Sequence, residues 1–142
     1  MKVYLEPWAI TPTRAHSTDA GLDLYTPRDF ILLAKGGSAT IDTGVHVRLP
    51  HRTFGKIESK SGLNVNHGIV SCGGVIDEGY DGSIAVKLYN FSAHKYMFRK
   101  GEKIAQLIVQ PCLYEPVVPC TEDDYYSVQT ERGSKGFGST GR

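Results

Sequence analysis

Apolar and polar residues alternate with a period of two over much of this chain. In segment 39–49, apolar residues occupy every second position on either side of Gly44, with Thr, Asp, His and Arg between them. Segment 83–89 alternates in the same way, with Ile, Val and Leu at its even positions. Such alternation is typical of strands with one buried face. The first segment therefore predicts two half-buried strands with a bend near Gly44, and the second predicts a further strand.

Shorter signals complete the pattern. Three apolar runs are bounded by Gly, Pro, Asn or Asp, at 30–33, 68–72 and 113–118. Segment 102–110 has the i, i+3, i+4 apolar spacing of a helix, but its nine-residue length and the following Pro111 favour a buried strand. A short helical turn is expected after Lys60. With 16 glycines and 7 prolines among 142 residues, the chain leaves little room for long helices.

These elements predict an all-β fold, a single-domain jelly roll or β-sandwich built from many short strands. We expect it to occupy residues 1–120, and residues 121–142 to form a flexible C-terminal arm that ends in a glycine-rich stretch. A chain of this length can bury roughly two thirds of its unfolded surface, which is enough for one hydrophobic core.

Composition and charge exclude several classes of protein. No apolar run approaches the ~20 residues of a membrane span, and the N-terminal residues lack the apolar region of a signal peptide, so a cytoplasmic location is expected. The net charge of +1 argues against a broad nucleic-acid surface, and any anion site must be local. Three cysteines without CxxC spacing and five scattered histidines predict neither a disulfide framework nor a zinc site.

The glycine-rich stretch, RGSKGFGSTG at residues 132–141, has two interpretations. Four of its ten residues are glycine and only Phe137 is large and apolar, so a free terminus is the ordinary reading. Yet its backbone N–H groups, hydroxyls and two cations could converge on a polyphosphate, while Phe137 offers a face for stacking on a base. The stretch alone does not decide between a free terminus and a segment that closes over a bound nucleotide.

Four further patches combine polar and glycine residues at strand ends: AGLDL at 20–24, SKSGL at 59–63, GGVIDEGYDG at 73–82 and GEKIAQLIV at 101–109. The third is expected to be a hairpin with Val75 and Ile76 in its first strand. Each patch has an ordinary structural explanation. For example, Asp77 could bond its own turn, Lys60 could be a solvated charge, and Tyr80 a half-buried sheet aromatic.

Taken together and in this order, the five motifs resemble those of the homotrimeric dUTP pyrophosphatases (dUTPases), over about residues 15–141. The resemblance implies hydrolysis of dUTP to dUMP and pyrophosphate by water attack on the α-phosphorus. That reaction limits uracil incorporation into DNA and supplies dUMP for thymidylate synthesis. The resemblance also implies a homotrimer with Mg²⁺ as cofactor, whose sites use more than one subunit and whose arm closes over a neighbour's site.

The resemblance also assigns roles to residues. Asp77 would be the general base, and Asp23 would lie near the metal and act through water. Tyr80 would lie against the deoxyribose and Phe137 would stack on uracil, while Lys60 stands where Arg is most usual in the family. The expected substrate-binding residues are Lys60, Ser61, Gly62, Gly74, Val75, Ile76, Tyr80, Ala85, Gln106, Arg132, Phe137, Gly138 and Ser139.

Two alternatives remain open. A dCTP deaminase or bifunctional relative shares the fold, although the GVID sequence and the intact glycine-rich stretch favour plain pyrophosphatase. A trimeric regulatory or binding protein could also keep the fold. The presence of Asp77, Ser61, Tyr80 and Phe137 together argues against a dead site. It leaves room for a regulatory protein partner if the chain is phage-encoded; neither membrane nor direct nucleic-acid binding is expected.

Overall fold

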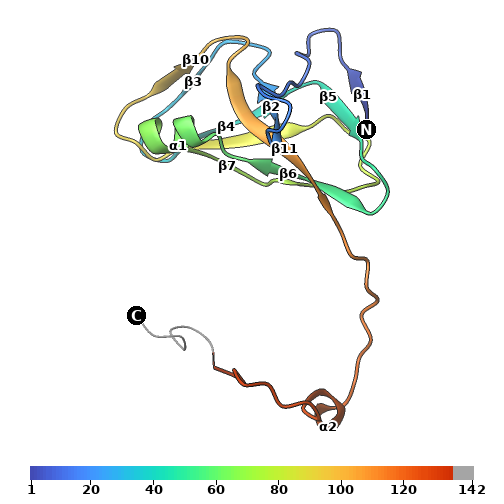
Figure 1. Ribbon diagram of the computed structural model, residues 1–142. Coiled ribbons are helices and arrows are strands. Elements are labelled where there is room, and N and C mark those ends of the chain that lie inside the picture. The colour runs from blue at the N-terminus through green and yellow to red at the C-terminus, as the bar shows by residue number, and fades with distance from the viewer. Residues whose placement is uncertain (136–142) are drawn as a thin grey trace.

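The computed structural model describes residues 1–135, and its regular elements are mostly strands (Figure 1). The strands are β1 (Lys2–Leu5), β2 (Gly21–Tyr25), β3 (Phe30–Leu32), β4 (Gly37–Asp42), β5 (Val45–Arg48), β6 (Thr53–Glu58), β7 (Ile69–Cys72), β8 (Val75–Ile76), β9 (Ala85–Asn90), β10 (Tyr96–Phe98) and β11 (Lys103–Pro111). Two short helices accompany them, α1 (Ser61–His67) and α2 (Glu122–Tyr125).

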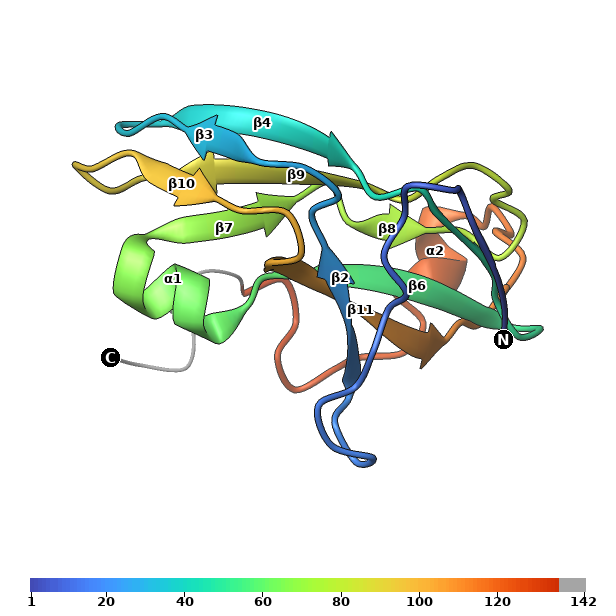
Figure 2. The same ribbon diagram turned by 90° about the horizontal axis from the view of Figure 1, so that it is seen from above.

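Antiparallel pairing arranges the strands in two main sheets. One has the order β2-β11-β6-β8 and the other β4-β9-β7, while β1 pairs with β5 and β3 with β10. Residues from both main sheets form one continuous hydrophobic core, with Leu24 and Leu107 on one side and Ile41 and Val86 on the other. Figure 2 shows the layers from above. The predicted all-β sandwich is confirmed.

The bend predicted near Gly44 carries the chain from one sheet to another. β4 pairs with β9, whereas β5 pairs with β1. Gly44 has φ 67°, and a Cβ there would lie 2.8 Å from the Trp8 ring. Both its backbone conformation and the packed indole therefore require glycine at this position.

Segment 102–110 is a strand, as its length and Pro111 indicated. β11 pairs with β2 on one side and β6 on the other, so it lies inside its sheet. Ile104, Ala105 and Leu107 are all buried. A central strand with residues covered on both faces produces the apolar run that also fits a helix. The short helical turn expected after Lys60 is likewise present as α1.

Two expectations need correction. The apolar run 113–118 forms no strand, and Val117 is 94% exposed; Pro116 and Pro119 cannot donate hydrogen bonds to a ladder. The hairpin around residues 73–82 is formed by β7 and β9, not by the strand of Val75 and Ile76, because β8 pairs with β6 in the other sheet. Segment 73–84 is thus a long connection that visits the opposite sheet and returns.

The chain leaves the sheets where β11 ends. Residues 113–135 are all exposed, and Figure 1 shows this segment extending away from the body. Their single helical turn, α2, is capped by the Thr121 hydroxyl, which accepts a hydrogen bond from the Asp124 N–H at 3.2 Å. The division at residues 120 and 121 stays a prediction. Within residues 1–135, no helix has the length and apolar character to cross a membrane.

Candidate active site

Three charged side chains from three segments of the chain meet at one end of the four-stranded sheet. Asp23 on β2 is 3% exposed. Its Oδ1 lies 2.6 Å from Lys60 Nζ, just beyond β6, and its Oδ2 lies 2.7 Å from Lys103 Nζ at the start of β11. The antiparallel registers of β11 with β2 and with β6 bring these positions together. We call Asp23, Lys60 and Lys103 the ionic cluster.

The ionic cluster is held in its charged form. Burial alone would raise the pKa of Asp23, but hydrogen bonds from Lys103 and Lys60 together outweigh it and lower that pKa below its usual value. The hydrogen bond to Asp23 in turn raises the pKa of Lys103. Two ammonium groups share one carboxylate, so the cluster carries one net positive charge, which suits a phosphate ligand. Lys103 is not among the site residues predicted from the sequence.

Gln106 steadies the backbone that precedes Lys60. Its Nε2 donates a hydrogen bond to the Ser59 carbonyl at 3.1 Å, and the Ser59 hydroxyl accepts one from the Ser71 N–H at 2.8 Å. Ser61 is exposed at the start of α1, and a Cβ on Gly62 would meet no atom within 4 Å. Hydrogen bonds thus hold the backbone just before the predicted phosphate-binding segment, while Ser61 and Gly62 are accessible to a ligand. Their contacts with phosphate stay predictions.

The predicted general base, Asp77, and the predicted sugar contact, Tyr80, lie on the connection between β8 and β9. The Asp77 carbonyl accepts a hydrogen bond from the Tyr80 N–H at 3.1 Å, which closes a turn. The Tyr80 hydroxyl donates to the Ser83 carbonyl at 3.0 Å, and a Cβ on Gly82 would lie 2.3 Å from that hydroxyl oxygen. Tyr80 therefore folds back over Gly82 while staying 44% exposed. The Asp77 side chain is exposed beside it.

The strand before this turn has a structural role. The Gly74 carbonyl accepts a hydrogen bond from the Ile57 N–H at 2.7 Å, and a Cβ on Gly74 would lie 2.7 Å from the Ile57 carbonyl oxygen. Ile76 belongs to the core, while Val75 is 64% exposed. Ala85, at the start of β9, pairs with Asp42. Any contact of Gly74 or Ile76 with the nucleobase would therefore be made by backbone groups that form no hydrogen bond within the sheet.

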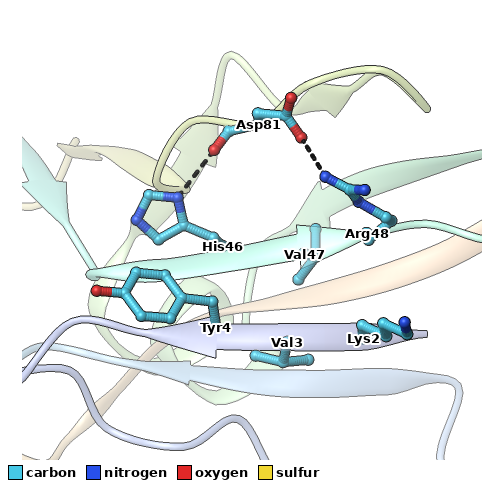
Figure 3. A pocket seen from close by; sticks show the side chains of 7 residues that line it. All are labelled: Lys2, Val3, Tyr4, His46, Val47, Arg48 and Asp81. Carbon is cyan, nitrogen blue, oxygen red and sulfur yellow. Dashed lines mark hydrogen bonds and ion pairs between the residues drawn. The ribbon is translucent and has the colours of Figure 1, made fainter.

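A hollow of about 440 Å³ lies beside the far end of the same turn (Figure 3). There the Asp81 carbonyl lies 2.9 Å from His46 Nδ1, and Arg48 donates to the Asp81 carboxylate at 3.1 Å. His46 and Arg48 both project from β5 towards Asp81. β5 thus holds the last part of the turn that Asp77 begins.

The predicted residues around Asp77 and those around Lys60 do not meet within one chain. β8 pairs with the first half of β6, Ile76 opposite Gly55, so Asp77 lies near the beginning of β6. Lys60 follows the end of β6. At about 3.3 Å per residue, the six residue steps from Phe54 to Lys60 separate these groups by roughly 20 Å. Figure 2 accordingly shows β8 and α1 towards opposite ends of the sheet.

The arm contributes to neither group in the described residues. The Arg132 guanidinium donates from Nε to the Lys135 carbonyl at 3.0 Å, a contact within the arm itself. Phe137, Gly138 and Ser139 lie outside the described residues, so their predicted contacts with the nucleotide stay predictions.

The donor groups do not fit a magnesium ion held by protein side chains. Both carboxylate oxygens of Asp23 are engaged by ammonium groups. Within residues 1–135, no group of three or more His, Cys, Asp or Glu side chains could hold a metal. A hard cation requires several free oxygen ligands. Metal binding through Asp23 stays a prediction that would require displacement of a lysine.

Comparison with known proteins identifies the family. A family model described as dUTPase matches residues 8–141. The chain belongs to the dUTPase family. It is 40% identical to rat deoxyuridine 5′-triphosphate nucleotidohydrolase, with 99% of this chain matched but just under two thirds, 66%, of the relative. It is 41% identical to the enzyme of the same name from Clostridium novyi, with 94% of this chain and 92% of the relative covered.

Solved dUTPases share the fold. The dUTPase of Staphylococcus bacteriophage 80alpha with dUPNHPP superposes with a TM-score of 0.87 and 30% identity, covering 99% of this chain and 98% of that one. Phage dUTPases of that kind control transfer of virulence genes. A mutant dUTPase from S. aureus phage phi11 coordinates a structural Mg(II) ion; its TM-score is 0.75 at 26% identity, covering 85% of this chain and 95% of that one.

Proposed function

We propose that this chain hydrolyses dUTP to dUMP and pyrophosphate, with Asp77 as the general base for a water that attacks the α-phosphorus. The observation that carries the proposal is an exposed carboxylate and the Tyr80 ring fixed on one turn, in a chain of the dUTPase family. A positioned carboxylate base contributes typically 10² to 10⁴-fold to such a step. The relatives at about 40% identity are named for this substrate.

The phosphate chain would bind at the other end of β6. Lys60 and Lys103 supply positive charge there, and Ser61 and Gly62 present an uncrowded backbone. Gln106 would add a phosphate contact from β11, and Arg132 would add another when the arm closes. Mg²⁺ would enter as part of the substrate, chelated by the triphosphate, since the described side chains provide no free set of oxygen ligands.

A complete site would need more than one copy of the chain. Reacting groups must come within ~3.5 Å of one another, while Asp77 and Lys60 of one chain lie at opposite ends of β6. The base-selecting turn of one subunit would therefore face the ionic cluster of another, and the arm would close over a neighbour's site. This arrangement supports the predicted homotrimer.

Base selection would come from the connection between β7 and β9. Fixed backbone donors and acceptors match the edge of uracil and mismatch that of cytosine, and a mismatch that leaves buried polar groups unpaired can discriminate by ~10⁴-fold. Tyr80, held over Gly82, would exclude a ribose 2′-OH. Phe137 would stack on the uracil ring.

Pyrophosphate release from each deoxynucleoside triphosphate and from UTP, with and without Mg²⁺, tests the reaction. Hydrolysis selective for dUTP supports it, whereas ammonia release from dCTP would favour the deaminase alternative. No turnover of any nucleotide would leave the regulatory alternative. A regulatory partner and a cytoplasmic location remain predictions.

Mixed oligomers test the shared site. Asp77→Asn and Lys60→Ala chains are each expected to be inactive or impaired alone. After joint unfolding and refolding, some mixed sites would combine an intact Asp77 from one chain with an intact Lys60 from the other. Recovered dUTP hydrolysis supports sharing between copies. If both residues serve the same chain's site, mixing restores nothing, and light scattering checks that trimers formed.

A further inference from the structure

Glu78, the residue after the proposed base, joins three segments that are distant in sequence. Its Oε2 accepts hydrogen bonds from the Tyr114 hydroxyl at 2.6 Å and from the Arg52 N–H at 2.9 Å. Its Oε1 lies 2.9 Å from His51 Nδ1. The turn between β5 and β6 is thereby tied to the turn that contains Asp77, and so is the segment from β11 to the arm, residues 112–120, which we call the arm root.

These bonds also keep Glu78 ionised. The hydrogen bond from Tyr114, followed by those from His51 and the Arg52 N–H, lowers the pKa of Glu78 to about 2. The same bond raises the pKa of Tyr114 to about 12. A carboxylate with every oxygen facing a donor has little tendency to take up a proton near neutral pH. The surroundings of Glu78 therefore suit an anchor better than a base.

The turn is consequently fixed at two points. Glu78 holds its beginning to residues 51 and 52, and Asp81 holds its end to β5 through His46 and Arg48 (Figure 3). Asp77 and Tyr80 each lie next to one of these anchors. A general base must lie within hydrogen-bond reach of the attacking water while that water lies within attack distance of the phosphorus, and small displacements of catalytic groups are costly.

We propose that Glu78 is a positioning residue, which sets the orientation of Asp77 and links it through Tyr114 to the root of the C-terminal arm. The inference rests on the proposed function, since dUTP hydrolysis is what requires a fixed Asp77. Glu78 receives three hydrogen bonds, two from the turn at residues 51 and 52 and one from Tyr114, and itself touches no reacting atom. The arm root is thereby connected to the turn that carries the base.

Three variants separate positioning from other roles. Glu78→Ala removes all three bonds. Glu78→Gln keeps a carbonyl oxygen for the Arg52 N–H and the Tyr114 hydroxyl, while its amide can donate to His51 in the tautomer whose Nδ1 accepts. Tyr114→Phe removes the arm-root bond alone. Asp29→Asn is the matched control, because Asp29 also accepts from a side chain, Arg99, and from a backbone N–H but lies on a different loop.

We expect Glu78→Ala to lower kcat for dUTP by about 10 to 100-fold with a smaller change in KM. Glu78→Gln should retain kcat within about threefold, with the acidic limb of its pH profile unmoved; Tyr114→Phe should lose less than Glu78→Ala. In hydrogen–deuterium exchange, amides of residues 77–83 should exchange about tenfold faster in Glu78→Ala than in the wild-type chain or in Asp29→Asn.

Native kcat and native exchange in Glu78→Ala would overturn the proposal. Equal loss of kcat in Glu78→Gln and Glu78→Ala, with a shifted pH profile, would also overturn it and give Glu78 an acid–base role. The exchange measurement requires no activity. If the wild-type chain released no pyrophosphate from dUTP, the proposed function would fail while faster exchange in Glu78→Ala still supported positioning.

Discussion

Lys103 at the start of β11 and Lys60 just beyond β6 approach the same buried carboxylate, one at each oxygen of Asp23. The pKa of Asp23 is lower in the folded chain than its unfolded value. The ionic cluster therefore stabilises the fold above the unfolded pKa, about 3.9, and that stabilisation is lost as the pH falls through the folded pKa. Asp23 thus links a predicted ligand site to the stability of the sheet.

The first prediction follows from the lowered pKa of Asp23 in the folded chain. Asp23→Asn keeps the shape of the side chain but leaves two ammonium groups without their counter-charge. We expect its Tm to be well below that of the wild-type chain at pH 7, and the gap to narrow below about pH 4 as wild-type Asp23 becomes protonated. Thermal unfolding at several pH values measures this, with the exposed arm variant Asp123→Asn as control. A gap independent of pH would contradict the ionic explanation.

The second prediction concerns the two lysines of the cluster. Lys60→Arg should keep dUTP turnover within about tenfold, because the charge is retained and only the geometry of donation changes. Lys60→Ala should raise KM markedly. Lys103→Ala should also weaken substrate binding, since it leaves the Asp23 carboxylate with one cation instead of two. If alanine at position 60 is harmless, that residue serves Asp23 alone and does not bind phosphate.

The third prediction tests the proposed base. Asp77→Asn preserves size and hydrogen-bonding capacity but removes the proton acceptor, so kcat for dUTP should fall by about 10² or more while binding is retained. Calorimetric titration with a non-hydrolysable dUTP analogue checks binding separately. Near-native turnover would mean that Asp77 only shapes its turn. Asp29→Asn again serves as the unrelated carboxylate control.

The fourth prediction separates two kinds of glycine. Gly74→Ala places a Cβ 2.7 Å from the Ile57 carbonyl oxygen and should cost about 1 to 3 kcal/mol of stability through overpacking. Gly62→Ala meets no atom within 4 Å, so it should leave Tm unchanged and affect only the KM for dUTP. Thermal unfolding and steady-state kinetics of both variants decide this. Equal Tm values would show that β8 can move away from β6.

The fifth prediction concerns the glycine-rich stretch. Deletion after Glu131 should leave Tm nearly unchanged, because residues 113–135 are exposed and outside the core, but should sharply lower dUTP hydrolysis. Removal of Arg142 alone is the matched control and should have little effect. Phe137→Ala should reproduce part of the loss, and Phe137→Trp should keep much of the activity through stacking. Equal rates with and without residues 132–142 would show that this segment has no role in dUTP hydrolysis.

Local periodicity was sufficient for much of the fold. The alternation in 39–49 and 83–89 predicted β4, β5 and β9 because a half-buried strand requires every second residue to be apolar. The motif order predicted the family, which the match over residues 8–141 confirmed. By the same motifs the sequence selected Asp77, Lys60 and Tyr80 as candidates, whose roles are now open to test.

Pairing between distant strands could only be decided in three dimensions. The alternation around Gly44 does not reveal that β4 and β5 join different sheets, and the GVID sequence does not reveal that β8 pairs with β6. The contacts of Lys103 with Asp23 and of Tyr114 with Glu78 depend on the same registers. Periodicity records which face of a strand is buried; the neighbour of each strand is set by packing of the whole core, which only the tertiary structure specifies.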